Sequence, residues 1–394
     1  MRRLAAERAP LETELGAMQR SGEVDYFAGI TIVNRIFLSA RPSAIRRLAE
    51  RGDVRAVIPE RREDRPPAGR SEEAPGPPLA SADLRDRRSW ALDAIGAPSA
   101  WARGADGAGV VVGSLDTGVT TAHEQLMPGF RGGADSWFDP DGGSPDPTDS
   151  AGHGTMVLGC AVAANVEGWT IGVAPRARWV AALANPSNHY VNTTMTRAAD
   201  WMGSVSSPDV VTAAWGHGPG SCDSVDRPLV DALRALEIVV VFPSGNSGPA
   251  AGTGESPANL SDLYPGGRAN LSVAATTRDG GVAVLSGRGP MACSPGSEFP
   301  WVSAPGQDVL SPLPVGRSAY WVSSGTSPAV GFVAGAAALI LQRCPTLRAD
   351  AVQTLLARTA RDLTPDGHDP ATGYGLVDLR AAFDALDRSC PTGR

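Results

Sequence analysis

Residues 89 to about 388 alternate between short runs of continuously apolar, β-branched residues and Ala-rich stretches with helical spacing. The clearest apolar runs are GVVVGSLD, WVAALA, DVVTAAW, EIVVVFPSG and LSVAAT. A strand that is apolar on both sides must be covered on both faces, and helices that cross over between parallel strands supply that cover. This range therefore predicts an α/β fold in three layers, with a mostly parallel central sheet between two layers of helices.

Three polar residues in this range follow a predicted strand or open a predicted helix. Asp116 ends the strand GVVVGSLD, His153 lies between glycines where an apolar helix begins, and Ser327 starts the helix that runs to about Gln342. Each has an ordinary structural explanation when taken alone, as a turn-capping aspartate, a structural histidine and a helix-capping serine. Ligands of such sheets bind beyond the carboxyl ends of the strands, which is where these residues are expected.

Together the three residues supply the parts of a nucleophilic serine site. A serine nucleophile needs a base to remove its proton, and the base needs a carboxylate that orients it and stabilises its cationic form. Ser327 at a helix N-terminus also offers its own amide to a developing oxyanion. Asn246, in the glycine-bracketed turn SGNSG, is a candidate second oxyanion donor, although a turn-forming asparagine is its plainer interpretation.

The order and wording of these motifs resemble the subtilisin-like serine peptidases, and most of all the bacillopeptidase F branch of that family. The Asp, His and Ser motifs read DTGVTTAHEQL, GHGTMVLG and GTSPAVGFVAG, with further matches at IGVAPRARWVAAL, SGNSG and VSAPGQDVLS. The resemblance covers about 300 residues in the family's order. The GxSxG elbow of the α/β-hydrolases is absent from the sequence.

The resemblance implies a serine endopeptidase that hydrolyses peptide bonds of proteins. Asp116, His153 and Ser327 would form its catalytic triad, and Asn246 would complete its oxyanion hole. An extended peptide would pair with the backbone of residues 213–218. Its P1 side chain would enter a pocket between two segments, the first with Ala214, Trp215 and Gly216 and the second with Ser244, Gly245 and Asn246. Neither segment holds an acidic residue, which favours a neutral or apolar P1 side chain.

The Ser motif departs from the family's usual wording at three positions. Pro328 takes the place of methionine, Gly331 that of proline and Phe332 that of histidine. Proline is tolerated in the first turn of a helix, whereas glycine in a helix interior costs about 1 kcal/mol. We therefore expect a looser seat for Ser327 and a slower enzyme, with no catalytic group lost.

Residues 1–60 form a smaller unit. Their pattern predicts a helix, two strands, a short helix and a last strand, in the segments PLETELGAMQRSG, VDYFAGIT, NRIFLSA, PSAIRRLAERG and VRAVIPE. The unit resembles the inhibitory pro-domains of secreted subtilases, which are ferredoxin-like β-α-β-β-α-β sandwiches, but without the first strand. The resemblance implies a zymogen with its pro-domain in cis. A start internal to a longer precursor explains the missing strand, and an intracellular enzyme is the rival explanation.

Residues 61–88 join the two parts. They combine charged side chains with five prolines and few large apolar residues. Such a segment buries little surface, so we expect an exposed, cleavable linker between the pro-domain and a peptidase domain at residues 89–390.

Composition excludes several functions and locations. The formal charge of −7 disfavours nucleic acid as a partner, and the absence of lysine excludes lysine nucleophiles. The longest apolar run, FVAGAAALIL, is too short to span a membrane, and the first residues do not form a secretory signal. The resemblance nevertheless implies an extracellular or extracytoplasmic monomer that acts on proteins or peptides, with a cytoplasmic location as the alternative.

The five cysteines lack the spacing of a metal site. The resemblance implies a disulfide between Cys222 and Cys293. A second disulfide between Cys344 and Cys390 is a further hypothesis, and Cys160 is expected to pack inside the His153 helix.

No cofactor is required for the implied reaction, but subtilases often bind structural calcium. One loop, DPDGGSPDPTD, carries four carboxylates, those of Asp139, Asp141, Asp146 and Asp149. Their spacing does not fit an EF-hand, so a solvated turn is favoured over a calcium site.

Two other functions stay open. A pseudo-peptidase would keep the fold as a binding module, and labelling with a fluorophosphonate would distinguish it from an active enzyme. An esterase would use the same acyl chemistry, but no lipase-like elbow favours it.

Overall fold

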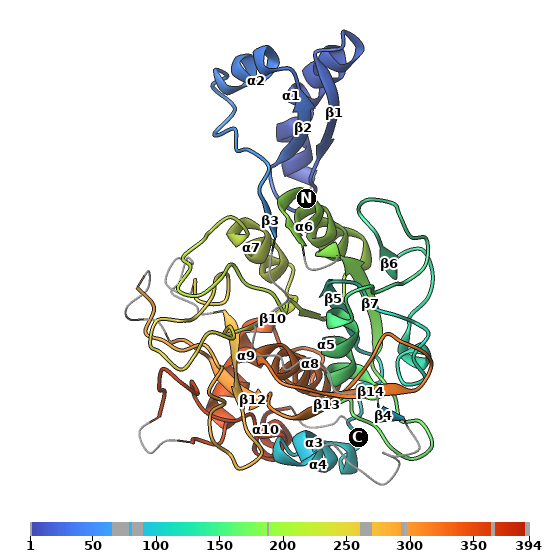
Figure 1. The fold of residues 1–394 in the computed structure, drawn as a ribbon, viewed down its shortest axis with the longest axis vertical. Helices are drawn as coiled ribbons and strands as arrows, with labels where there is room; N and C mark the ends of the chain where they lie inside the picture. The colour runs from blue at the N-terminus through green and yellow to red at the C-terminus, as the bar shows by residue number, and fades with distance from the viewer. Residues whose placement is uncertain are drawn as a thin grey trace.

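The central sheet of the computed structural model confirms the predicted three-layer α/β fold. The structure describes residues 2–64, 79–80, 90–186, 189–260, 270–292, 296, 298–363 and 367–390. Within them, seven parallel strands lie in the order β12-β11-β10-β9-β5-β7-β6 (Figure 1). Their bounds are β5 (Val111–Asp116), β6 (Trp137–Phe138), β7 (Arg178–Leu183), β9 (Val210–Thr212), β10 (Val239–Pro243), β11 (Leu271–Thr276) and β12 (Val302–Pro305).

Helices cover both faces of this sheet. On one face lie α5 (His153–Val162) and α8 (Thr326–Arg343), and on the other lie α6 (Asn192–Trp201), continued by the π-helical turn η4 (Met202–Ser206), and α7 (Arg227–Ala235). The outer helices are α3 (Trp90–Ala94), α4 (Ala97–Ala102), α9 (Ala349–Thr359) and α10 (Leu379–Ser389). The first fifteen residues of α8 are all buried, because this helix passes through the centre of the core.

The close approach of α5 and α8 explains Gly331. A Cβ atom at this position would lie 2.3 Å from the carbonyl oxygen of Val157 and 2.7 Å from Cβ of Cys160. Real Cβ atoms do not tolerate such contacts, so only glycine lets the two helices pack at this distance. The expectation that Gly331 loosens the seat of Ser327 is wrong at this point, because the residue is held in a tight helix contact.

The N-terminal unit has its own small core. It consists of α1 (Arg2–Arg20), the antiparallel pair β1 (Val24–Gly29) and β2 (Ile36–Ala40), and α2 (Pro42–Ala49). Its buried residues are Leu15, Met18, Val24, Ala44 and Leu48. Figure 1 shows this unit, in blue, at one end of the molecule beside α6.

The strand expected at VRAVIPE is not formed, which corrects the prediction. Residues 54–60 pair with neither β1 nor β2, which pair with each other, and Val57 and Ile58 are exposed. A strand needs a neighbour for its backbone groups, and this segment has none within the described residues.

The range 61–88 contributes two short strands to the rest of the fold. β3 (Arg62–Asp64) pairs with β8 (His189–Val191), and β4 (Leu79–Ala80) pairs with β14 (Ala319–Ser323), which also pairs with β13 (Val309–Pro312). Residues 65–78 and 81–89 lie outside the described part. The segment expected to be an exposed linker is thus anchored to the C-terminal domain at two places.

The cysteine predictions have different outcomes. Cys344, just after α8, forms a disulfide with Cys390, just after α10, with Cα atoms 6.0 Å apart, which confirms that hypothesis. Cys160 is fully buried in α5, as expected. The pairing of Cys222 with Cys293 stays a prediction, because Cys293 lies outside the described residues.

None of the helices in the described ranges has the length and apolar character needed to cross a membrane.

Candidate active site

Asp116, His153 and Ser327 meet at the carboxyl edge of the central sheet. His153 Nδ1 lies 2.7 Å from Asp116 Oδ1, and His153 Nε2 lies 2.9 Å from Ser327 Oγ. Asp116 ends β5, His153 begins α5, and Ser327 is the second residue of α8. The three residues are 2%, 8% and 2% exposed, so their polar groups interact mainly with one another and with the surrounding protein.

Glycine makes the contact between Asp116 and His153 sterically allowed. A Cβ on Gly154 would lie 2.1 Å from the carbonyl oxygen of Gly118 and 2.9 Å from Cβ of Asp116. Gly152, on the other side of His153, has a φ of +83°, in the left-handed region that favours glycine. The motif GHG therefore lets the start of α5 reach the end of β5.

A buried carboxylate that the sequence did not single out for this purpose holds the two motifs together. Asp149 Oδ1 accepts hydrogen bonds from Thr117 Oγ1 and Gly152 N, both at 2.8 Å. Its Oδ2 accepts from the backbone N (2.9 Å) and the hydroxyl (2.7 Å) of Thr155. Burial raises the pKa of Asp149, an effect that these hydrogen bonds partly offset. Asp149 thus bridges the turn after Asp116 and the first turn of α5.

Asp149 therefore has a different role from the other three carboxylates of the loop that the sequence offered as calcium ligands. Asp139 instead accepts hydrogen bonds from the backbone of Asp141 and Ser144, as in a self-capped turn. Among the residues that the structure describes, the four carboxylates do not form a cluster with ligand spacing.

Asn246 is held in one orientation by the residue before Ser327. Its Oδ1 accepts hydrogen bonds from Thr326 N (2.8 Å) and Thr326 Oγ1 (2.9 Å). Both partners act as donors, so the atom facing them must be the amide oxygen. The Nδ2 donor of Asn246 hydrogen-bonds to no other described residue, and it is therefore available to an acceptor beside Ser327.

The two segments expected to line the P1 pocket lie on either side of one side chain. Trp215 and Ser244 are buried, and their side chains pack into the protein. Gly216 and Gly245, in contrast, both contact the side chain of Glu255. Glu255 was missed by the sequence reasoning because it lies nine residues after Asn246, in the loop segment GESPANL.

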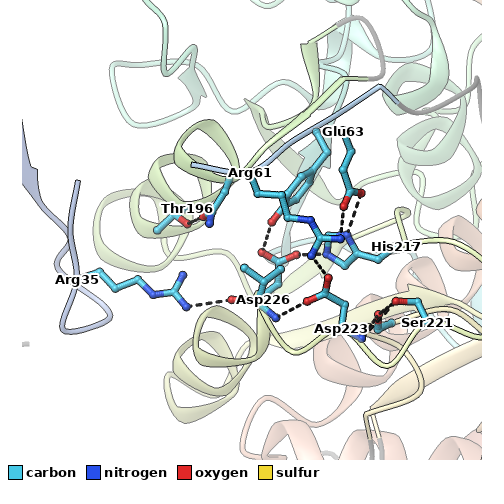
Figure 2. A network of polar contacts seen from close by, with 12 residues as sticks. Arg35, Arg61, Glu63, Thr196, His217, Ser221, Asp223 and Asp226 are labelled. Carbon is cyan, nitrogen blue, oxygen red and sulfur yellow. Dashed lines mark hydrogen bonds and ion pairs between the residues drawn. The ribbon is translucent and has the colours of Figure 1, made fainter. Parts of the chain in front are cut away.

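A polar network surrounds His217, at the far end of the 213–218 segment (Figure 2). His217 Nε2 lies 2.6 Å from Asp226 Oδ2, and Nδ1 lies 3.4 Å from Glu63 Oε2. Arg61 pairs with Glu63 and with Asp223, so strand β3 is tied to the loop before α7. The network connects the start of the 61–88 range directly to the predicted substrate segment.

The same network contains the one group of described side chains with metal-ligand spacing. Ligand atoms of Glu63, His217 and Asp223 lie within 4.8 Å of one another. The guanidinium of Arg61 already pairs with both carboxylates, so the chain supplies its own cation at this place.

Comparisons with known proteins identify the family. The family model described as the subtilase family matches residues 107–375. Bacillopeptidase F of Bacillus subtilis is 32% identical over 406 aligned positions, which cover 94% of this chain and 27% of that protein. Subtilisin Savinase of Lederbergia lenta is 33% identical over 295 positions, covering 74% of this chain and 97% of the relative.

Among solved structures, fervidolysin from Fervidobacterium pennivorans is similar, with a TM-score of 0.63 and 27% identity. The match covers 75% of this chain and 45% of fervidolysin, which is described as a keratinolytic enzyme related to subtilisin. The chain spans only about a quarter of bacillopeptidase F but almost the whole of Savinase's length. Together with the family model, these likenesses confirm the resemblance read from the motifs: the chain belongs to the subtilase family of serine endopeptidases.

Proposed function

We propose that this chain hydrolyses peptide bonds of proteins through Asp116, His153 and Ser327. The observation that carries the proposal is the continuous hydrogen-bonded series from Asp116 Oδ1 through the His153 ring to Ser327 Oγ, with contacts of 2.7 and 2.9 Å. These distances let the ring accept a proton at Nε2 while Nδ1–H donates to the carboxylate. All groups required for the reaction come from the chain itself, so the proposed chemistry needs no cofactor.

The reaction begins when Ser327 Oγ attacks the scissile carbonyl carbon. His153 removes the hydroxyl proton at Nε2, and Asp116 stabilises the imidazolium that forms. The negative charge develops on the carbonyl oxygen, where the Ser327 N–H and the Asn246 Nδ2 donate hydrogen bonds. The imidazolium then protonates the leaving amine, and water repeats the sequence to release the acyl group from Ser327.

We also propose that the substrate binds as an added strand along residues 213–218. The backbone after β9 leaves the sheet here, and Ala213 N donates to the carbonyl of Val241 at its start. Trp215 contacts Tyr190, His217 and Phe242 through its ring, which supports a rigid backbone at this segment. The roles of Ala214, Trp215 and Gly216 in this scheme are those of backbone partners.

The contacts of the N-terminal unit support a zymogen, with residues 1–60 as a pro-domain in cis. Asp200 at the end of α6 accepts hydrogen bonds from the backbone N of Thr31 (2.7 Å) and Ile32 (2.8 Å). Ile30, Ile32 and Val33 pack into the same core cluster as α6 and α7. In this proposal the 61–88 range is the cleaved segment and residues 89–390 are the peptidase domain.

The Cys344–Cys390 disulfide supports an extracellular or extracytoplasmic location. Disulfides persist in oxidising compartments and are rare in the reducing cytosol. The proposal therefore places the mature enzyme outside the cytoplasm, acting as a monomer on protein substrates.

Incubation of the full-length protein tests the catalytic assignment and the zymogen together. We expect cleavage within residues 61–88, labelling by a fluorophosphonate, and hydrolysis of casein. Ser327→Ala should abolish labelling and lower kcat by about 10⁶-fold, because the nucleophile and its base act as a unit. Casein hydrolysis by Ser327→Ala at the wild-type rate would contradict the triad, and an unlabelled, inactive wild type would favour a pseudo-peptidase.

A further inference from the structure

One buried carboxylate, that of Asp226, joins two segments that are far apart in the sequence. The first is β8, where the hydroxyl of Tyr190 donates to Asp226 Oδ1 at 2.7 Å. The second is the 213–218 segment, where His217 Nε2 lies 2.6 Å from Asp226 Oδ2 (Figure 2). Asp226 and Tyr190 are 0% exposed, and so is the side chain of His217. Because Asp226 directly precedes α7, the carboxylate ties three parts of the chain together.

An extended piece of the chain already lies against both segments. β3, at the start of the range proposed to be cleaved, pairs with β8 in antiparallel fashion, and Glu63 is the partner of Tyr190 in this pairing. Glu63 Oε2 also lies 3.4 Å from His217 Nδ1. β3 therefore has its backbone against β8 and a side chain against the 213–218 segment.

The 213–218 segment exposes backbone while the side chain of His217 anchors it inside. His217 and the glycines on either side of it are partly exposed as residues, although the His217 side chain is fully buried. The backbone N of His217 donates to the carbonyl of Ser256 at 2.9 Å, and its ring meets the ring of Tyr190 edge-on, with centroids 4.8 Å apart. The path of the segment therefore depends on where His217 is held.

We propose that Asp226 is a positioning residue of the substrate site, and that it acts through His217 and Tyr190. The proposal rests on the proposed peptidase function, and in particular on strand addition along residues 213–218. Hydrogen bonds to a carboxylate are short and about twice as strong as neutral ones, so Asp226 holds both donors firmly. Loss of the carboxylate removes the acceptor that the two segments share, and with it their fixed spacing.

The spacing matters most for long substrates. β3 precedes the rest of the range proposed to be cleaved, so a cut further along leaves it on the amino side of the broken bond. Substrate residues well before the scissile bond would lie where β3 lies, between β8 and the 213–218 segment. A short peptide that reaches only the surroundings of Ser327 does not depend on that spacing. Misplacement of the two segments therefore penalises long peptides selectively.

The test uses the full-length protein after its own cleavage, with two peptides that share their P1 residue and their chromogenic leaving group. One has only a blocked P1 residue, and the other has five further residues before it. Asp226→Ala should lower kcat/KM for the long peptide by about 10- to 100-fold and for the short peptide by less than about threefold. Tyr190→Phe, which removes one donor, should lower the ratio of long to short by about threefold.

Two further variants control the measurement. Asp226→Asn keeps the size of the side chain and can still hydrogen-bond both neighbours, with His217 in its other tautomer, so it should lose less than Asp226→Ala. Asp231→Ala, on α7, removes only a partly exposed ion pair with Arg227 and should leave the ratio unchanged. Fluorophosphonate labelling counts the active sites in each preparation, which corrects for misfolded protein.

The outcomes separate the two proposals. If wild type neither labels nor cleaves either peptide, the proposed peptidase function fails. If wild type is active but Asp226→Ala loses the same factor on both peptides, or keeps its rate on the long one, positioning by Asp226 is wrong while the peptidase function stands. Should Asp226→Ala fail to fold, Tyr190→Phe decides the point, and an unchanged ratio in that variant overturns the proposal.

Discussion

Two regions of the molecule are held by different interactions. One is the carboxyl edge of the central sheet, where Asp116, His153 and Ser327 meet, and the other is the contact of the N-terminal unit with α6. Asp116, His153 and Ser327 are almost fully buried, and glycines at 152 and 154 allow the close contacts around them. The N-terminal unit contacts the rest of the chain through two backbone N–H groups that donate to Asp200 on α6, and through Ile30, Ile32 and Val33, which pack beside α6 and α7.

In the proposed zymogen, the sheet edge stays intact and the N-terminal unit is released. A buried, close-packed site costs several kcal/mol to disturb, whereas a hydrogen bond to a charged group contributes about 1.5–3 kcal/mol. Changes at the sheet edge should therefore affect catalysis or global stability, and changes at the docking contact should affect release of the unit.

The largest effect after loss of Ser327 is expected from Asn246→Ala. Removal of one oxyanion donor lowers kcat by about 10² to 10³-fold, a range established on subtilisin itself. KM should change little, because the bond strengthens only as charge develops. Steady-state kinetics on one peptide would check this. Thr326→Val, which removes one of the two donors that orient Asn246, should cause a smaller loss, and equal losses would mean that the variants act by unfolding.

The free energy of unfolding is expected to depend on pH through His123, a buried residue in the Asp motif. Its Nε2 lies 3.1 Å from the carbonyl oxygen of Ala319, and its Nδ1 accepts from Gln125 N, so the neutral ring fits the site. Burial lowers the pKa of His123 to about 4. The unfolded chain binds a proton near pH 6.5, so this stabilisation is present above pH 6.5 and is lost as the pH falls towards 4.

The loss attributable to His123 should approach about 3 kcal/mol at pH 4. Urea unfolding at several pH values, on wild type and His123→Gln, would measure it. We expect the variant to be less stable at pH 7 and to lose less stability on acidification. The other groups of the chain are the same in both proteins, so only the difference between the curves counts, and parallel curves would contradict the prediction.

Gly331→Ala tests the packing of α5 on α8. Alanine normally stabilises a helix relative to glycine, by about 1 kcal/mol. Here the added methyl group meets the carbonyl oxygen of Val157, so we expect a loss of about 1 to 3 kcal/mol in the free energy of unfolding. Thermal unfolding would measure the change. A rise in Tm would show that the helix contact is looser than described.

An effect no larger than that of Gly331→Ala, and confined to one contact, is expected where the N-terminal unit docks. Asp200→Ala leaves the N–H groups of Thr31 and Ile32 without their acceptor, which should weaken docking by about 1 to 3 kcal/mol. In the Ser327→Ala background, limited proteolysis should then cut the N-terminal unit faster. Asp231→Ala on α7, which removes only a partly exposed ion pair with Arg227, serves as the control. Equal protection of both variants would mean that Asp200 does not hold the unit.

Sequence pattern predicted the strands that are apolar along their whole length. The five predicted runs correspond to β5, β7, β9, β10 and β11, because burial on both faces demands apolar residues at every position. β6 was not predicted because it has only two residues, and β12 was not predicted because its residues, VSAP, include a serine and a proline and do not form an apolar run. The strand expected at 54–60 is not formed for another reason. Its sequence pattern favours an extended backbone, but a strand also needs a neighbouring strand to pair with.

The identities of the proposed catalytic residues were likewise readable from local motifs, since each motif carries its own glycines and helix start. Only the tertiary structure decided which distant segments lie beside them. Asp149 bridges two motifs, and Thr326 orients Asn246. Arg61 and Glu63 lie in the network around His217. Glu255, in a loop without a recognisable motif, lies between Gly216 and Gly245. Local patterns arise from burial and backbone preference, which act on neighbouring residues, whereas these contacts depend on how the chain closes over long separations.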